Sequence, residues 1–287
     1  MERNNVDLND DEAGSAARRK LYLAALNGDW KSVEDMPDIQ RRITTIGETA
    51  LHIAAAANQE DFVKNLLNRL SRENLAAENN VGNTALHYAT AAGNVKIAKL
   101  MLEKRSDLPN LGSEEKPLFM AASLGHSQMA QFLYNKTKGI VCGWNQTEQA
   151  KLFITCVGGE LYGIAMEILM INRNIATARN MEGKTALQLL ARNPSAFVSK
   201  SRSWLKFKQE NSKQASELFK KCLQEYRGDD AVIQNVLFDA AEEGNIECLI
   251  MLIRLNLIYY GKQKGGKAYF MLRLRSAMKA YSASLMR

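Results

Sequence analysis

The chain has 287 residues, of which 46% are apolar and 24% are charged. This balance is typical of a folded globular chain and excludes disordered and collagen-like classes. The formal net charge is +7, but residues 261–287 hold seven basic residues and no acid, so the rest of the chain is formally neutral. A nucleic-acid interface needs a basic stripe on the folded body, and we expect none here.

The N-terminal segment, residues 1–16, is polar and acidic, and we expect it to be disordered. It has no apolar run that could serve as a signal peptide. The apolar stretches further along the chain are shorter than the ~20 residues of a membrane span. The four cysteines lie far apart, without the paired spacing of a zinc site or a disulfide framework. These features predict a cytoplasmic chain, either free or at the cytoplasmic face of a membrane.

An internal repeat organises the chain. Residues Gly47–Ala54 and Gly82–Ala89 lie 35 residues apart and match at six of eight positions, and Gly183–Gln188 keeps the Gly-x-Thr-Ala-Leu core. The leucine of this motif marks weaker copies as well. Its positions are 30 to 35 residues apart except for a last interval of 50: Leu21, Leu51, Leu86, Leu118, Leu152, Leu187 and Leu237. Such a period predicts stacked supersecondary units.

A second helix follows the motif in each unit. Its apolar residues recur at i, i+1, i+4 and i+5, which places them on one side of an α-helix. The stripes are Phe62, Val63, Leu66, Leu67; Ile97, Ala98, Met101, Leu102; Met129, Ala130, Leu133, Tyr134; Ile164, Ala165, Ile168, Leu169; and Cys248, Leu249, Leu252, Ile253. Between the two helices stand residue types that tolerate positive φ at a tight turn: Asn58, Gly93, Gly125, Gly159 and Gly244.

The motif and its spacing resemble the ankyrin repeat, whose consensus opens with Gly-x-Thr-Pro-Leu-His-x-Ala-Ala. The resemblance implies an all-α ankyrin-repeat solenoid of helix-turn-helix units joined by short β-turn loops. We assign about six units to residues 17–193, a helical spacer to 194–228, a further ankyrin-like unit to 229–260 and a basic tail to 261–287. The residues that carry the structural motif are Thr49, Leu51, His52, Thr84, Leu86, His87, Gly93, Gly125, His126, Thr185, Leu187 and Gly244.

The copies differ in quality. Asn58 replaces the turn glycine, Lys116-Pro117 replaces Thr-Ala, and Phe153 and Gln188 stand in place of histidine. We therefore expect uneven stability along the stack, with the copies over 113–193 the weaker ones. In the spacer, Pro194 should stop the repeat, and a helix should follow that docks on the stack through Ala215, Leu218, Phe219, Cys222, Leu223 and Tyr226.

Two segments resemble a narrower family, the plant ankyrin-repeat proteins with a C-terminal PGG domain. They are Leu21–Trp30 and Leu237–Asn245. Members of that family place ankyrin blocks ahead of membrane helices and are associated with stress and defence signalling at membranes. This chain looks like a form truncated before that domain, because a basic tail follows Tyr260. The tail is either an incidental terminus or a contact for anionic lipid.

No motif points to catalysis. The three histidines, His52, His87 and His126, occupy consensus ankyrin positions, where imidazoles bond the loops of neighbouring units. Gly183-Lys184-Thr185 resembles the end of a phosphate loop, but Ala178 stands where that loop needs its first glycine. We expect no enzyme activity, no metal and no cofactor.

The remaining function is protein binding through the concave face. The family resemblance implies contacts from residues that flank the Gly of Gly-x-Thr and from the two positions before the inter-helix turn. The first group is Thr45, Ile46, Glu48, Asn80, Val81, Asn83, Met181, Glu182 and Lys184, and the second is Ala56, Ala57, Ala91, Ala92, Ser123 and Leu124. This surface is weakly charged and partly apolar, which favours other proteins over nucleic acid as partners.

Overall fold

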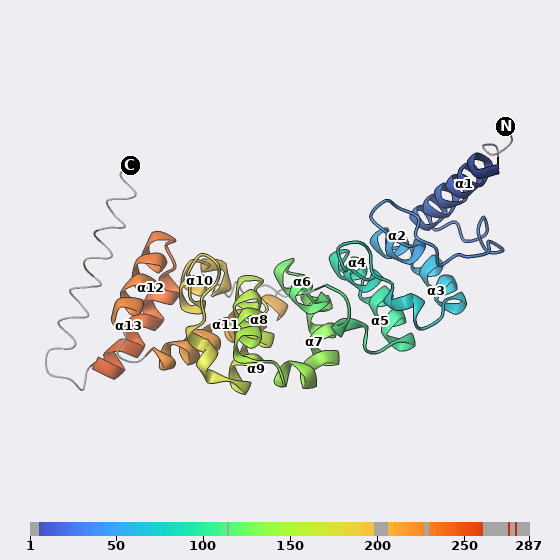
Figure 1. Cartoon of the computed structure of the whole chain (residues 1–287). Helices are drawn as coiled ribbons and strands as arrows, with labels where there is room; N and C mark the ends of the chain where they lie inside the picture. The colour runs from blue at the N-terminus through green and yellow to red at the C-terminus, as the bar shows by residue number, and fades with distance from the viewer. Residues whose placement is uncertain are drawn as a thin grey trace. The chain divides into compact units, whose positions relative to one another are not determined.

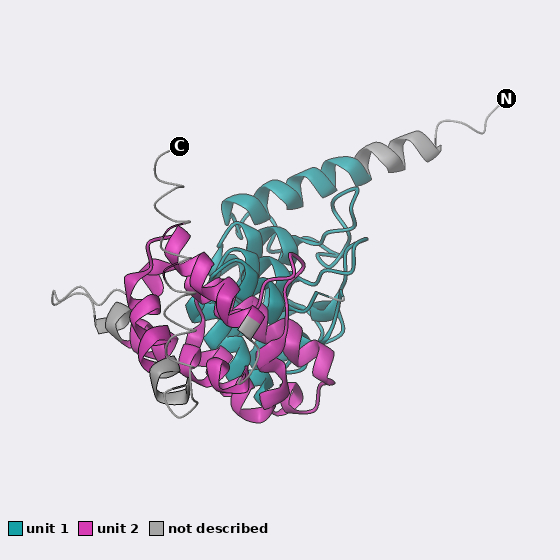
Figure 2. Ribbon diagram, turned by 90° about the vertical axis from the view of Figure 1, so that its left-hand side faces the viewer, with its two compact units in different colours: residues 1–138 teal, residues 139–287 magenta. Residues whose placement is uncertain are grey.

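The computed structural model describes residues 6–113, 115–197, 206–226 and 230–260, together with Arg275 and Lys279. In these ranges the chain is built from helices, 3-10 turns and loops, and its β-structure consists of isolated bridges. The chain divides into two compact units, residues 1–138 and 139–287 (Figure 2). The fold is thus an all-α stack of repeats, and each unit is described by itself.

The first unit contains six helices and the start of a seventh. Figure 1 shows helices α1 to α7 in chain order, and their bounds are Val6–Asn27, Ala50–Ala56, Glu60–Arg69, Ala85–Ala91, Val95–Lys104, Pro117–Ser123 and Ser127–Cys142. The first helix of each repeat packs on the next first helix, α1 on α2, α2 on α4 and α4 on α6, and the second helix α3 packs on α5. The 35-residue period therefore produces two parallel layers of helices.

The predicted leucines and stripes form the core of this unit. The motif residues Leu51, Leu86 and Leu118 are buried, and so are the stripes of α3 and α5. Short helices such as α2 and α4 are only marginally stable alone, so burial of these apolar stripes against neighbouring repeats supplies most of their stability. The loops that enter the repeats end in antiparallel bridges, Arg42 to Thr49 and Glu78 to Thr84.

The turns between the paired helices use the left-handed region, as the sequence predicts, with one correction. Asn58, Gly93, Gly125 and Gly244 have φ between 59° and 70°. Gly159, however, caps α8 at φ −86°, and Glu160 takes the left-handed position at φ 60°. Counted from the motif leucine, α8 ends one residue later than α2, α4 and α6, so the turn falls on the residue after the glycine.

The second unit contains α8 (Gln146–Gly158), α9 (Tyr162–Ile171), α10 (Ala186–Ala191), α11 (Lys206–Glu225), α12 (Asp230–Glu242) and α13 (Ile246–Tyr260). The first helices α8, α10 and α12 pack on one another in turn. The repeated stacking of the first unit is thus present here also, although the 50-residue interval lies between Leu187 and Leu237.

Helix α11 changes the interpretation of the spacer. It packs on α9 and α10, which is where the second helix of the α10 repeat belongs. Its buried residues Leu218, Phe219, Cys222 and Leu223 have the same i, i+1, i+4, i+5 spacing as the other second helices. Helix α11 is therefore better described as the second helix of this repeat, with the inserted residues between α10 and α11, than as part of a spacer between two blocks. Pro194 begins a short 3-10 turn, Pro194–Ala196, which ends the direct connection from α10.

The N-terminal end of the chain differs from the prediction, and most of the C-terminal end lies outside the described residues. Residues 1–16 are predicted to be disordered, but α1 begins at Val6 and continues without a break to Asn27. The basic tail, residues 261–287, lies outside the described residues apart from Arg275 and Lys279.

Candidate binding face

The histidines of the motif join neighbouring repeats. The Nδ1 atom of His52 accepts a hydrogen bond from the Thr49 amide at 3.2 Å, so its proton is on Nε2, which donates to the Asn83 carbonyl oxygen at 3.0 Å. His87 repeats the first contact with the Thr84 amide at 3.0 Å. Burial lowers the pKa of His87 to about 4 and also lowers the pKa of His52. Both rings are therefore neutral connectors near pH 7, with no free site for catalysis.

His126 has a related role at the turn. Its Nε2 atom lies 3.0 Å from the carbonyl oxygen of Ala91 in the preceding repeat. Gln59 makes the same backward contact, since its Nε2 donates to the Leu26 carbonyl at 2.8 Å. The residue after the turn thus satisfies a carbonyl at the end of the previous first helix, a group that a helix terminus leaves without an internal partner.

In two copies of the motif the middle residue of Gly-x-Thr contacts the next repeat. Glu48 is buried and accepts a hydrogen bond from the Tyr88 hydroxyl, and burial together with this carboxylate raises the pKa of Tyr88 to about 12. Lys184, at the same motif position, lies 3.7 Å from the Asp239 carboxylate. Sequence reasoning placed both on the binding face. In the structure Glu48 is buried against the next repeat, and Lys184 pairs with Asp239 while 31% of its side chain stays exposed.

The loop tips before this position remain open. The Asn80 amide donates to the Ile46 carbonyl at 2.9 Å, and its side chain donates to the Thr45 carbonyl at 3.2 Å. These bonds fix one tip to the next and leave the Ile46 and Val81 side chains 49% and 68% exposed. Asn83 is half-buried beside them. Two large apolar side chains therefore stand side by side in a rigid row.

The first helices extend this open surface. Ala56, Ala91, Ser123 and Leu124 are exposed at or just beyond the ends of α2, α4 and α6, while Ala57 and Ala92 are half-buried. No Asp, Glu, Lys or Arg occurs in any of these three helices. We call the exposed row of the first unit the apolar face: Leu26, Ile46, Ala56, Val81, Ala91, Ser123 and Leu124.

Sequence reasoning missed Leu23 and Leu26 on α1, which are both exposed. The sequence indicates their place in the repeat, because alignment of Leu21 with Leu51 gives Leu23 the position of Ile53 and Leu26 the position of Ala56. This indication was overlooked because this copy lacks the Gly-x-Thr motif. In the second unit the candidate residues do not form a comparable row: Met181 and Glu182 are exposed at one loop tip, and Lys184 pairs with Asp239.

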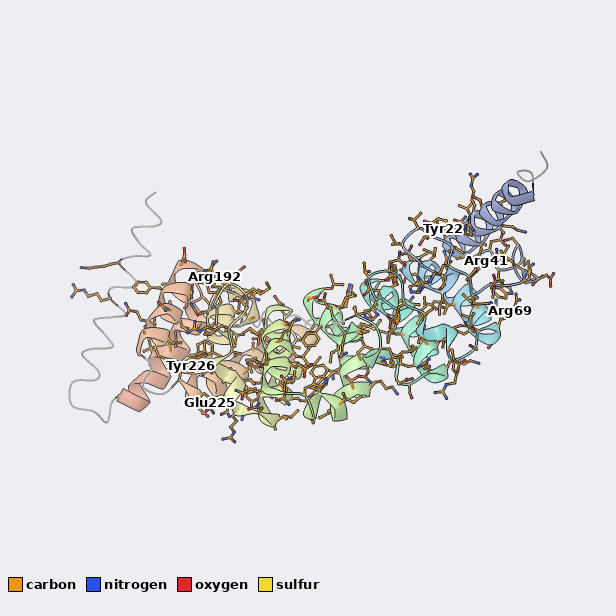
Figure 3. All side chains as sticks on the ribbon, in the orientation of Figure 1. Tyr22, Arg41, Arg69, Arg192, Glu225 and Tyr226 are labelled. Carbon is orange, nitrogen blue, oxygen red and sulfur yellow. The ribbon has the colours of Figure 1, made fainter. Side chains whose placement is uncertain are left out.

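A polar network replaces the histidine link in the second unit. Gln188 stands in the histidine position, and its Nε2 donates to the Asp239 carboxylate at 2.9 Å. Arg192, labelled in Figure 3, reaches the same carboxylate at 3.1 Å and Glu243 at 3.5 Å. Asn245 donates to the Leu190 and Ala191 carbonyls at 3.3 and 2.9 Å. These contacts tie α10 to α12 and α13 across the insertion.

Two kinds of site are absent from the part of the chain that the structure describes. No group of three or more His, Cys, Asp or Glu side chains is placed to hold a metal ion. No described helix is both long and apolar enough to cross a membrane.

Three cysteines, Cys156, Cys222 and Cys248, are buried, and burial raises the pKa of each thiol to about 12. They pack as small apolar side chains and are poor nucleophiles.

Comparison with known proteins identifies the repeats. A family model described as ankyrin repeats (3 copies) matches residues 21–112 and 51–142. The search of curated proteins found no match to this chain. The matched residues contain the Thr-His links, the left-handed turns and the apolar face described above. The chain therefore contains ankyrin repeats over residues 21–142.

Proposed function

We propose that this chain is a non-enzymatic protein-binding module whose partner docks on the apolar face of the first unit. Ankyrin repeats are generally protein–protein interaction modules, and the matched residues include this face. The observation that supports the location is the charge-free surface over α2, α4 and α6, bordered by Ile46, Val81 and Leu124. Large apolar side chains on a rigid surface are typical of interaction sites, because their burial drives association.

The rigidity of the face favours binding. The tips are bonded to each other through Asn80, and the first helices are fixed through His52 and His87. A surface that is ordered before binding loses less conformational entropy when a partner docks. The partner should present a complementary uncharged segment, since a charged group placed on this face would lose its water without gaining an ion pair.

A photo-crosslinking experiment tests the location. A photoreactive residue is placed at Val81 on the apolar face or, as a matched control, at Lys64 on the second helix α3, which is also exposed. We expect discrete protein adducts in cell extract from position 81 and not from position 64, and we expect Ile46→Glu to remove them. Equal adducts from both positions, or adducts that survive Ile46→Glu, would place the interaction elsewhere.

The sequence resemblance supports a finer proposal for the biological setting. We propose a cytoplasmic role in plant stress or defence signalling, on the strength of segments Leu21–Trp30 and Leu237–Asn245. The alternative is a truncated form of a membrane-associated ankyrin/PGG protein whose basic tail contacts anionic lipid. The seven cations of residues 261–287 favour that contact, because each Lys or Arg near an anionic surface contributes about 1 kcal/mol.

Liposome sedimentation separates these two settings. The full chain and a version ending at Tyr260 are mixed with anionic or neutral vesicles. Pelleting of the full chain alone, and with anionic vesicles alone, would support the membrane alternative. If neither version pellets, the lipid contact is discarded and the free cytoplasmic setting is retained.

A further inference from the structure

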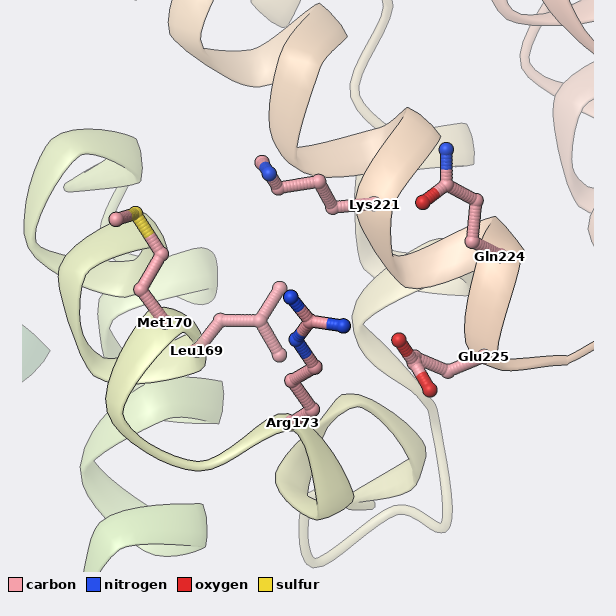
Figure 4. Close-up of a pocket in the computed structure, with 6 residues that line it drawn as sticks. All are labelled: Leu169, Met170, Arg173, Lys221, Gln224 and Glu225. Carbon is pink, nitrogen blue, oxygen red and sulfur yellow. The ribbon is translucent and has the colours of Figure 1, made fainter.

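The second unit contains a small hollow lined by its second helices α9 and α11. Its volume is about 190 Å³, and its walls come from the end of α9, from the turn Arg173–Thr177 and from the last turns of α11. The lining residues are Leu169, Met170, Arg173, Lys221, Gln224 and Glu225. Figure 4 shows Lys221 reaching from α11 toward Met170, and the Arg173 guanidinium lying between Leu169 and Glu225.

The two cations of this hollow, Arg173 and Lys221, differ in their side-chain contacts from four other arginines of the chain. Arg69, Arg105, Arg179 and Arg192 each bond a carbonyl or carboxylate oxygen. Within the described residues the structure shows no ion pair or hydrogen bond for the side chain of either Arg173 or Lys221. They approach one space from two different elements, and the single acid that lines it is Glu225. Two cations and one carboxylate leave one positive charge, which a monoanion would neutralise.

The volume of the hollow and its apolar lining restrict the kind of ligand that it can bind. Small-molecule pockets usually measure about 300–1,000 Å³, so a hollow of about 190 Å³ accepts one residue-sized group. Leu169 is buried and Met170 is 67% exposed, so together they give the hollow an apolar wall and rim. The ligand should therefore combine one negative charge with one apolar group. The Gln224 side-chain oxygen and the Glu225 carboxylate add acceptors for an N–H donor.

We propose that this hollow binds the C-terminal residue of a protein partner that ends in an apolar amino acid. The terminal carboxylate pairs with Arg173 and Lys221, since an arginine guanidinium matches a carboxylate in shape and charge. The apolar side chain packs on Leu169 and Met170, and the last peptide N–H donates to Gln224 or Glu225. Capture of a chain end is a known mode of peptide recognition.

This site is independent of the apolar face. It lies in the second unit and uses second helices, whereas the apolar face lies in the first unit and uses first helices and loop tips. Loss of one by mutation should leave the other unchanged, so the two proposals fail separately. Helix α11 supplies three of the six lining residues of this site.

The test uses the full chain and N-acetyl-leucine, which carries one carboxylate, one apolar side chain and one amide N–H. Binding is followed by the ¹³C-methyl NMR signal of Met170, assigned with Met170→Leu. We expect a saturable shift with a dissociation constant in the millimolar range, on the order of 1 mM, as suits so small a ligand. N-acetyl-leucinamide, which lacks the charge, should bind at least about tenfold more weakly, a loss of about 1.4 kcal/mol.

Two variants and one control complete the design. Arg173→Gln and Lys221→Gln should each weaken binding of N-acetyl-leucine about fivefold or more, while Lys220→Gln should not, because Lys220 is exposed one residue away and does not line the hollow. Circular dichroism confirms that each variant is folded. Arg173→Gln and Lys221→Gln lie on different elements, so a similar loss of binding in both supports a shared site. Equal binding of acid and amide, equal loss in Lys220→Gln, or displacement by a lower concentration of inorganic phosphate would each overturn the proposal.

Discussion

The two units stack their first helices in the same way but join them with different chemistry. In the first unit a neutral histidine links one repeat to the next, with His52 Nε2 bonded to the Asn83 carbonyl. In the second unit Gln188 holds the same position and bonds the Asp239 carboxylate, which Arg192 and Lys184 also approach. The link is thus uncharged in one unit and ionic in the other.

The next element in the chain explains this difference. Asn83 belongs to a loop closed by the Glu78 to Thr84 bridge, so His52 finds a backbone carbonyl in front of it. In the second unit the group that meets Gln188 is a side chain, the Asp239 carboxylate of α12. Apolar packing of the first helices is therefore the constant feature of the stack. The polar link adapts to whatever the neighbouring repeat presents.

The largest effect should come from the shared feature, the buried motif leucine. Leu86 is 1% exposed, and Leu86→Ala should destabilise the first unit by about 2–5 kcal/mol through lost burial and the cavity that remains. Amide hydrogen exchange of peptides from 85–104 measures this in the full chain. Leu187→Ala should act similarly on the second unit, and an unchanged exchange rate in either unit would contradict the common packing scheme.

Lowering the pH should destabilise the histidine-linked first unit more than the second unit, where Gln188 takes the place of histidine. The pKa of His87 is about 4 in the folded chain and 6.5 when exposed, so below pH 6.5 the unfolded chain binds the proton more readily than the folded one. Stability contributed by the neutral ring is complete above about pH 6.5 and is lost as the pH falls toward 4, by about 3 kcal/mol at most.

Urea unfolding between pH 7 and pH 5 measures this loss. His87→Gln, which copies the residue found at Gln188, should reduce the pH dependence of the first unit, leaving the part that His52 contributes, and should leave the second unit unchanged. A wild-type slope that persists in His87→Gln would show that other groups cause the acid sensitivity.

The smallest effect should come from the ionic link. Asp239→Asn should destabilise the second unit by about 1–2 kcal/mol, because Gln188 keeps an acceptor while Arg192 and Lys184 lose their carboxylate. The matched control is Glu243→Gln, whose pair with Arg192 at 3.5 Å is partly exposed and should contribute less than about 0.5 kcal/mol. Salt should reduce the difference between wild type and Asp239→Asn. A salt-independent difference would indicate a packing defect and not a lost charge.

Much of the fold follows from local pattern. The Gly-x-Thr-Ala-Leu motif gave the starts of α2, α4 and α10, and the i, i+1, i+4, i+5 stripes gave the second helices. The same spacing occurs at Leu218, Phe219, Cys222 and Leu223, but the sequence analysis assigns this stripe to a spacer. The reason is distance: the stripe begins 31 residues after Leu187, whereas the stripe at Ile97 begins 11 residues after Leu86. Only the packing of α11 on α9 and α10 shows that it completes a repeat.

The binding face was predicted less well. Ile46, Val81, Ser123 and Leu124 are exposed as expected, but Glu48 and Lys184 are engaged by Tyr88 and Asp239. A sequence places a side chain at a motif position, and its partner comes from the next repeat, some 40 or 55 residues away. Such pairs depend on which residues the stacked neighbour presents, which no local pattern reveals.

The sequence by itself determined the repeat, its helices and its turns, because helix periodicity, caps and left-handed glycines act within a few residues. The tertiary structure decided which polar groups meet between repeats, that α11 is a second helix, and that Arg173 and Lys221 share one hollow. Those outcomes depend on contacts between elements far apart in the chain, where side-chain shape and charge meet only after the helices have packed.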